Sequence, residues 1–424
     1  MATIASGTLP AGSGADLGQR YRQVRSTTLA LVEPLSDEDA MVQSMPDASP
    51  AKWHLAHTAW FFETFILAGV SGYRAFDPSY RLLFNSYYKA LGGHPVRAQR
   101  GTFSRPSMEV VLQYREHVDE AMARLLDRHP APETLELVEL GLHHEQQHQE
   151  LILTDILHAF WTQPLRPAYA PPPGREPQRE AAPLRWIEHA GGRIECGAPE
   201  HGFAFDNERP RHSVLLAPFR LASRLATNAE YRAFIEDGGY QRPELWLSDG
   251  WDTVLREGWR APLYWEQRDG GWREFGLRGM QELEPAAPVA HLSYFEADAF
   301  ARWSLARLPL EGEWEAAACG AAIGGNLLEQ RALMALPAGE ACEEAQLFGD
   351  LWEWTASAYL AYPGFHPSAG AVGEYNGKFM CNQFVLRGGS FATPASHIRA
   401  SYRNFFPPHA RWQFMGVRLA KDER

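Results

Sequence analysis

The histidine pair His144 and His148 offers the clearest metal chemistry in this chain. The two residues stand four apart in the stretch His-Glu-Gln-Gln-His-Gln-Glu. On a helix, side chains at this spacing lie on one face, roughly 5–6 Å apart at Cβ, so both imidazoles can reach one ion. The pair therefore predicts part of a metal site, although a chain with 16 histidines could also produce it by chance.

A second segment, residues 53–57, has a helical pattern and carries two candidates for a third ligand, His54 and His57. They lie about 60° apart on a helical wheel, so spacing alone leaves both open. Three neutral imidazoles without a carboxylate keep coordination positions available for substrates. That arrangement is typical of a catalytic metal rather than a closed structural one.

The helical wheel also separates the polar neighbours of the pair. Gln147 falls near the face that His144 and His148 share, whereas Glu150 lies about 200° from His148. We therefore expect Gln147 to face the metal region. Glu150 is expected to brace a neighbouring helix rather than to bind the metal.

The elements that must position these residues are helices. Apolar residues at helical spacing predict helices over 21–35, 53–67, 110–125 and 135–161, the third preceded by the start signals Ser104 and Pro106. Four long helices suggest an antiparallel bundle, which can hold a metal between facing helices. The connection over residues 77–104 is long for a compact bundle, and such connections are often functional.

Composition narrows the class of protein. The 424 residues predict two or three domains, and 45% hydrophobic residues with 14 tryptophans suffice for large cores. A net charge of −12 disfavours nonspecific binding to nucleic acid or anionic membranes. Residues 1–18 lack the features of a signal peptide, and no run of 18 apolar residues occurs. Four scattered cysteines without a CxxC pair predict free thiols in a cytoplasmic protein: Cys196, Cys319, Cys342 and Cys381.

The second half of the chain differs in character from the first. Residues 164–183 are proline-rich and are expected to form an extended linker. Beyond them, glycines, tryptophans and short β-type runs predict an irregular α+β domain over 184–424. Two helices are expected there, over 228–236 and 294–305, and two buried strands near 385–390 and 415–420.

Each half resembles a known family. The bundle is similar to DinB-type four-helix bundles, through Leu-Ala-His at His57 and the HxxxHxE pattern from His144 to Glu150. The second half resembles the formylglycine-generating-enzyme fold, a C-type-lectin-like domain, through four segments: 227–231, 307–315, 349–354 and 387–390. The combination resembles the ergothioneine-biosynthesis sulfoxide synthases and the related selenoneine synthases. It implies a bundle over 15–163, a linker over 164–183 and a second domain over 184–424 that completes the substrate pocket.

The resemblance implies a non-haem Fe(II) enzyme with His57, His144 and His148 as ligands. The expected reaction is O2-dependent coupling of a thiol, cysteine or γ-glutamylcysteine, to C2 of the imidazole of hercynine, giving a sulfoxide. In the selenium branch the donor is a selenosugar. Tyr87 and Tyr88 are expected as catalytic residues, because a phenol near the metal can supply a proton or an electron.

The resemblance also assigns substrate contacts. Asn404 and Phe405 would bind hercynine together with Gln147, since a quaternary ammonium favours aromatic faces. Two arginines of the long loop, Arg97 and Arg100, would hold the donor's carboxylates.

Phe406 lines the same expected pocket, at a position where γ-glutamylcysteine-using members carry an acidic residue for the donor's ammonium. The departure counts against γ-glutamylcysteine. It leaves cysteine or a neutral donor such as a selenosugar open.

Three other readings compete with this one. A copper-dependent formylglycine-generating oxidase would need cysteines after Ser390, and none follows. A DinB-type metal-dependent thiol transferase would not need the second half of the chain. A lectin-like binding module with a structural metal would show no turnover.

Overall fold

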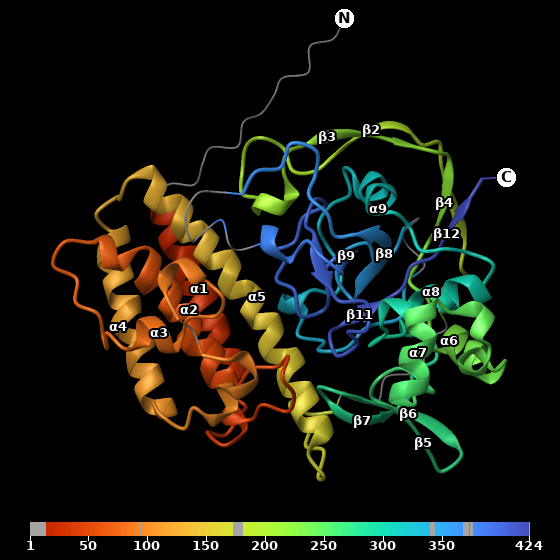
Figure 1. Ribbon diagram of the computed structural model, residues 1–424, viewed down its shortest axis with the longest axis horizontal. Coiled ribbons are helices and arrows are strands. Elements are labelled where there is room, and N and C mark those ends of the chain that lie inside the picture. The colour runs from red at the N-terminus through yellow and green to blue at the C-terminus, as the bar shows by residue number, and fades with distance from the viewer. Residues whose placement is uncertain are drawn as a thin grey trace, which may run out of the picture.

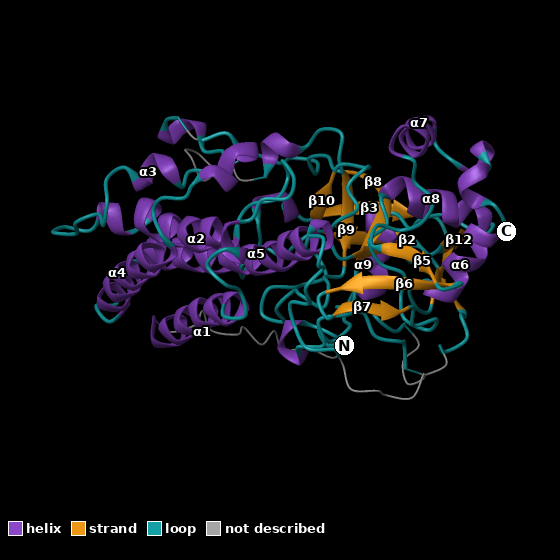
Figure 2. Cartoon of the chain, turned by 90° about the horizontal axis from the view of Figure 1, so that it is seen from below, coloured by secondary structure: helices purple, strands orange, loops and turns teal. Residues whose placement is uncertain are grey.

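A bundle of helices lies beside a mixed α+β region, with one long helix running along the boundary between them (Figure 1). The computed structural model describes residues 14–93, 95–172, 181–339, 344–367, 373 and 376–423. Seen from below, the helical and strand-bearing regions occupy opposite ends of the molecule (Figure 2). Cys342 and part of the proline-rich stretch, residues 173–180, lie outside the described residues.

The four predicted long helices are present in the bundle, together with the short α3 (Tyr80–Leu83) in the connection. Helix α2 is rich in tryptophan, phenylalanine and alanine and is buried on almost every side. Helix α5 begins with proline at its first turn, and α4 begins after Ser107, whose side chain accepts from the backbone of Val110. The long helices are α1 (Gly14–Val32), α2 (Ala51–Phe65), α4 (Met108–Leu126) and α5 (Pro132–Thr162).

A buried ion-pair cluster fixes the rotation of α5. Glu145 accepts hydrogen bonds from Arg25 (2.8 Å), Arg115 (2.9 Å) and Thr28 (2.6 Å). Burial opposes the charge, but the two guanidiniums prevail and hold the pKa of Glu145 at about 2. Because Glu145 is tied to α1 and α4, the histidines next to it are directed towards α2.

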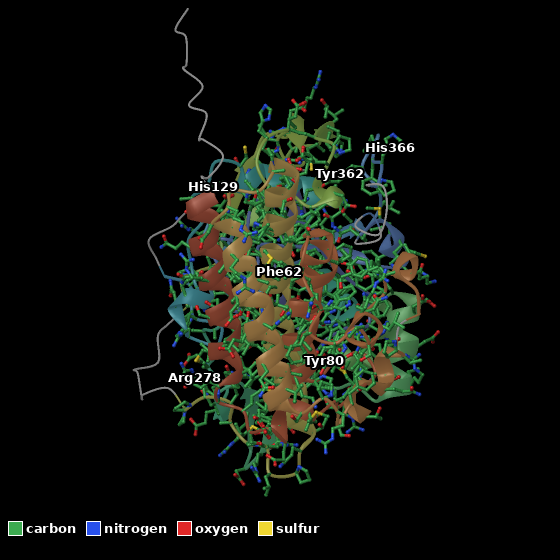
Figure 3. The ribbon with its side chains drawn as sticks, turned by 90° about the vertical axis from the view of Figure 1, so that its left-hand side faces the viewer. Phe62, Tyr80, His129, Arg278, Tyr362 and His366 are labelled. Carbon is green, nitrogen blue, oxygen red and sulfur yellow. The ribbon has the colours of Figure 1, made fainter. Side chains whose placement is uncertain are left out.

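A close approach brings α2 and α5 together one turn before His144. A Cβ atom at Gly141 would lie 2.5 Å from the ring of Phe62, so only glycine allows this helix spacing. Figure 3 faces the bundle and labels Phe62 among its helices. The contact sets the distance over which histidines of the two helices can meet.

The second region is built from small, mostly antiparallel sheets. The central one has the order β10 (Asn404–Phe406), β9 (Phe384–Arg387), β8 (Trp352–Ala358), β11 (Met415–Gly416), with β11 parallel to β8. A second joins β1 (Trp186–His189), β4 (Phe219–Ala222) and β12 (Ala420–Asp422). A two-stranded and a three-stranded antiparallel sheet complete the set. The first pairs β2 (Gly192–Cys196) with β3 (His212–Leu216), and the second has the order β5 (Trp265–Arg268), β6 (Gly271–Gly276), β7 (Gly279–Glu282).

Both helices expected in this region are present, as α6 (Asn228–Glu236) and α8 (Tyr294–Trp303), each with a complete capping box. Two more were not predicted, α7 (Ser248–Glu257) and α9 (Glu311–Ala318). Among the described cysteines, Cys196 is buried and Cys319 and Cys381 are exposed, all as free thiols, as predicted. None of the described helices combines the length and apolar character that a membrane crossing requires.

Glu150 corrects one expectation, because it contacts the second region rather than a neighbouring helix. Its carboxylate accepts from Ser390 (2.6 Å), Trp352 (2.8 Å) and Thr393 (2.8 Å). Ser390 reaches it from the Arg-Gly-Gly-Ser turn, where Gly388 has a φ of 98° that favours glycine. The wheel correctly kept Glu150 out of the histidine cluster but could not show that a different domain covers that side of α5.

Candidate metal centre and substrate cavity

Three buried histidines converge where α2 faces α5. One nitrogen from each of His57, His144 and His148 lies within 4.8 Å of the others, and all three residues are almost fully buried. The Nε2 atoms of His144 and His148 are 3.1 Å apart. Of the two candidates from α2, the structure brings His57 into this cluster.

The protonation of these rings suits a metal. The Nδ1 atom of His57 lies 2.7 Å from the carbonyl oxygen of Phe84 and donates to it, so Nε2 carries the free lone pair. Burial, reinforced by neighbouring histidines, puts the pKa of His57 and of His148 well below the ordinary range. Burial lowers the pKa of His144 to about 3. Neutral imidazoles are the form that binds a transition metal, so the residues fit one.

His54 lies beside the cluster rather than in it, and it lines the neighbouring cavity. Its Nδ1 atom is 2.7 Å from Nδ1 of His148, and its Nε2 atom is 3.2 Å from a carboxylate oxygen of Asp155. These contacts are satisfied when His148 donates to His54 and His54 donates to Asp155, which leaves Nε2 of His148 for the metal. Asp155 was not singled out from the sequence, although it stands seven residues after His148 and so shares its face of α5.

A cavity of about 440 Å³ opens beside the histidines and is lined by both halves of the chain. His144 and His148 form part of its wall, and Glu150, Leu151 and Thr154 extend the wall along α5. The residues predicted from the sequence that line it are Tyr87, Arg97, Arg100, Gln147, Asn404, Phe405 and Phe406. Residues more than 250 positions apart thus share one cavity.

The two candidate tyrosines have different environments. Tyr87 lines the cavity, and its ring lies 4.6 Å from the ammonium of Lys378. Tyr88 is fully buried, and its ring packs on Trp60, Phe65 and Tyr87. The geometry therefore places Tyr87, rather than Tyr88, on the cavity wall.

A chain of hydrogen bonds that the sequence did not reveal continues from Gln147. Its Nε2 atom donates to the hydroxyl of Tyr402 (2.6 Å), which lies 3.2 Å from Nε2 of His397. The Nδ1 atom of His397 is 2.9 Å from Nδ1 of His143 on α5. These contacts fix the orientation of Gln147 in the cavity. Tyr402 stands two residues before Asn404 in the sequence.

The two arginines differ in exposure. Arg100 is buried, donates from Nη1 to Ser49 (2.9 Å), and stacks 3.5 Å above the ring of Trp53. Burial, with the nearby charge of Arg97, lowers the pKa of Arg100 to about 9. Arg97 is about half exposed and lies 4.0 Å from Asp47. Arg100 is thus the better-fixed cation of the pair.

The aromatic residues of β10 have distinct neighbours. Phe405 stacks on Tyr359, with ring centroids 4.0 Å apart and planes within 10°. Phe406 meets Trp412 edge-on at 6.2 Å. Among the described residues that line the cavity, Glu150 carries the only carboxylate, and its three donors already occupy it.

Comparison with known proteins agrees with this architecture. Residues 20–152 match the DinB superfamily, and residues 174–332 and 328–423 match the Sulfatase-modifying factor enzyme 1-like domain. Hercynine oxygenase of Mycolicibacterium thermoresistibile is 34% identical, covering 96% of this chain and 95% of the relative. The chain belongs to the ergothioneine-biosynthesis sulfoxide synthase family.

Other relatives support the same family. Hercynine oxygenase of Mycobacterium tuberculosis is 33% identical, over 94% of this chain and 97% of the relative. Ergothioneine biosynthesis protein 1 of Schizosaccharomyces pombe is 28% identical over 52% of this chain and 28% of its own length. The expected fold, a DinB-like bundle followed by a C-type-lectin-like domain, is confirmed.

Proposed function

We propose that this chain is a non-haem iron enzyme that couples a thiol to C2 of hercynine with O2, giving a sulfoxide in ergothioneine biosynthesis. The observation that carries the proposal is the cluster of three neutral imidazoles, two of which, His144 and His148, line a cavity that both halves of the chain build. The relatives named hercynine oxygenase support the substrate. The atoms and electrons of this reaction balance, because one thiol, one imidazole C2–H and one O2 give one sulfoxide and one water.

His57, His144 and His148 would hold the iron. Bound iron would supply the oxidising chemistry of the coupling with O2. The role of His54 is to hold His148 in orientation through Nδ1, with Asp155 holding His54 in turn. The protein thereby fixes the tautomer of a ligand without adding a fourth one.

Hercynine would lie near β10 and the middle of α5. Phe405 presents an aromatic ring of the kind that attracts a trimethylammonium group. Gln147, whose orientation Tyr402 fixes, and Asn404 supply amides for the imidazole and the carboxylate. These three residues orient the substrate and bring its ring towards the histidines.

Tyr87 is the residue we propose to exchange a proton at the reacting atoms. Its ring is on the cavity wall, whereas Tyr88 is packed behind it. A phenol at this position can donate its proton while the C–S bond and the S–O bond form.

The donor would bind at the arginine end of the cavity, the part lined by Arg97 and Arg100. Arg100 and Arg97 suit a carboxylate, which favours cysteine or γ-glutamylcysteine. The cavity, however, offers no available acid among its described lining residues for the donor's ammonium, and Phe406 stands where one is expected. That observation supports a second candidate, C–Se bond formation with a selenosugar, which carries no ammonium. A thiol transferase fits less well, because it would leave the second half of the cavity without a role.

The test is reconstitution with Fe(II) under anaerobic conditions, followed by O2 and hercynine with cysteine, γ-glutamylcysteine or 1-seleno-glucose in parallel. Mass spectrometry identifies the product. A hercynine–sulfur sulfoxide with a thiol supports the first candidate and names the donor. A hercynine–selenium adduct with the selenosugar alone supports the second. No adduct with any donor in iron-loaded protein refutes both.

A further inference from the structure

The cavity contains a buried amide that neither the motifs nor the proposed reaction uses. Gln413 lines the cavity and is only 2% exposed. Its Nε2 and Oε1 atoms both lack a hydrogen-bond partner among the residues that the structure describes. An amide that has left water and gained no partner is unfavourable in the ligand-free protein, so its polarity calls for another explanation.

The loop that carries Gln413 does not depend on this side chain. The backbone carbonyl of Phe414 accepts from Trp352 (2.9 Å), and Met415 enters the sheet as β11 opposite Trp352. The carbonyl of Gln413 itself accepts from the backbone of Met415 (2.9 Å). The main chain therefore fixes the loop without using the side-chain amide.

The neighbours of Trp412, Phe414 and Arg100 indicate that Gln413 lies towards the arginine end of the cavity. The adjacent Phe414 belongs to the same buried apolar cluster as Leu153 and Leu157 in the C-terminal half of α5. Arg100 is linked to the same part of α5 through Ser49. Arg100 donates to the hydroxyl of Ser49, and the backbone N–H of Ser49 donates to Asp155 on α5 (2.7 Å). Gln147 stands about 10 Å earlier on the helix than Thr154, at the proposed hercynine end.

The chemistry of the two ends defines what the amide can bind. A side-chain amide offers two N–H donors and one carbonyl acceptor and carries no charge. The Nε atom of Arg100, also buried, likewise lacks a partner among the described residues. A single ligand group that pairs with both atoms of the Gln413 amide must accept from its nitrogen and donate to its oxygen, as an uncharged hydroxyl or amide does.

We propose that Gln413 is a recognition residue for the donor substrate and binds an uncharged hydroxyl or amide group of it. The inference rests on the proposed function. It gives a sugar donor, which has hydroxyls, or γ-glutamylcysteine, which has a peptide amide, an advantage over cysteine, which has neither. Loss of the amide should weaken the donor without affecting hercynine.

The test compares Gln413→Leu with the wild type, Fe(II)-loaded, anaerobic and saturated with hercynine. Calorimetry measures the Kd of cysteine, γ-glutamylcysteine and 1-thioglucose, the last as a stable stand-in for a selenosugar. We expect the preferred donor to be γ-glutamylcysteine or the thiosugar, with Kd raised at least ~10-fold by the substitution. The Kd of hercynine should be unchanged, and Gln267→Leu, on the exposed end of β5, should alter neither value.

Thermal unfolding of the ligand-free variants provides a readout independent of turnover. Removing an unpaired buried amide should leave Tm equal or higher in Gln413→Leu. Gln413→Asn keeps the polar group but shortens it by one methylene, and serves where the leucine variant does not fold; it too should weaken the donor. A large fall in Tm together with unchanged donor affinity would show a structural role and overturn the proposal, as would a wild-type preference for cysteine.

Failure of the proposed function would look different. If the wild type binds hercynine and the donor but yields no adduct with O2, the reaction is wrong while the role of Gln413 stands. If the wild type yields the adduct and Gln413→Leu binds the donor normally, the role of Gln413 alone is refuted.

Discussion

At the scale of single residues, hydrogen bonds decide which of two neighbouring histidines can serve a metal. His57 donates from Nδ1 to a backbone carbonyl and presents Nε2 to the cluster. His54 has both nitrogens engaged, one with His148 and one with Asp155. We expect His57→Ala to lose stoichiometric iron. His54→Ala should keep one iron per chain with an affinity about 10–100-fold lower.

Metal analysis after gel filtration, with a competing chelator titration, checks both variants. The pair serves as its own control, because each substitution removes one imidazole from the same helix. Retention of iron by His57→Ala and its loss from His54→Ala would contradict the assignment.

The tyrosines make a second matched pair. Since Tyr87 lines the cavity and Tyr88 is packed behind it, Tyr87→Phe should preserve hercynine binding but divert O2 towards oxidation of the thiol. Tyr88→Phe should leave the ratio of coupled product to oxidised thiol close to the wild type. Product ratios by mass spectrometry and Kd by calorimetry provide the comparison. An unchanged ratio in Tyr87→Phe would exclude the proton role.

A buried histidine away from the cluster predicts how stability depends on pH. Burial lowers the pKa of His291 to about 3, below its ordinary value of 6.5. As pH falls below 6.5, the unfolded chain binds a proton that the folded chain does not, so stability is lost on acidification. The loss is at most about 1.4 kcal/mol per pH unit for this group.

His291→Asn should therefore flatten the dependence of unfolding free energy on pH between 6.5 and 5 in the iron-free chain. Asparagine tolerates the φ of 62° at this position. Urea titrations at several pH values measure the slope. An identical slope in the variant and the wild type would show that His291 titrates normally.

At the scale of elements, the contact of α2 with α5 sets the metal geometry. Gly141→Ala should gain about 1 kcal/mol of helix propensity, yet its Cβ would meet the Phe62 ring at 2.5 Å. We expect the steric term to prevail, with lower Tm and weaker iron binding. Gly18→Ala on α1 is the control, because its nearest neighbour is the end of Arg22 at 3.8 Å, and it should be neutral or stabilising. Equal effects at the two positions would refute the spacing argument.

The sequence predicted the long helices well, because their apolar periodicity runs over many turns. It missed α9 (eight residues), which is too short to display a period, and the β5–β7 sheet, whose strands alternate little. The wheel placed Gln147 towards the cavity correctly. It was wrong about the partner of Glu150, since periodicity reports which side a residue faces and not what packs there.

At the scale of the whole molecule, the cavity exists only because the two regions pack together. Glu150 on α5 binds three residues of the second region, and Gln147 reaches Tyr402 there. Gln413 could not be found from the sequence, because its significance lies in an amide that has no partner among the described residues, in a cavity formed by distant segments. We propose the boundary between the regions at the proline-rich stretch 164–183.

The most direct measurement of the central claim is the product formed from hercynine and the preferred donor under isotopically labelled O2, in wild type and in His57→Ala. The account predicts a coupled product whose sulfoxide oxygen carries the label in the wild type, and no coupled product in the iron-free variant. For a selenosugar donor, the criterion is the C–Se adduct and its dependence on O2. A coupled product that forms equally well in His57→Ala, or without O2, would contradict the claim that the three-histidine centre performs the reaction.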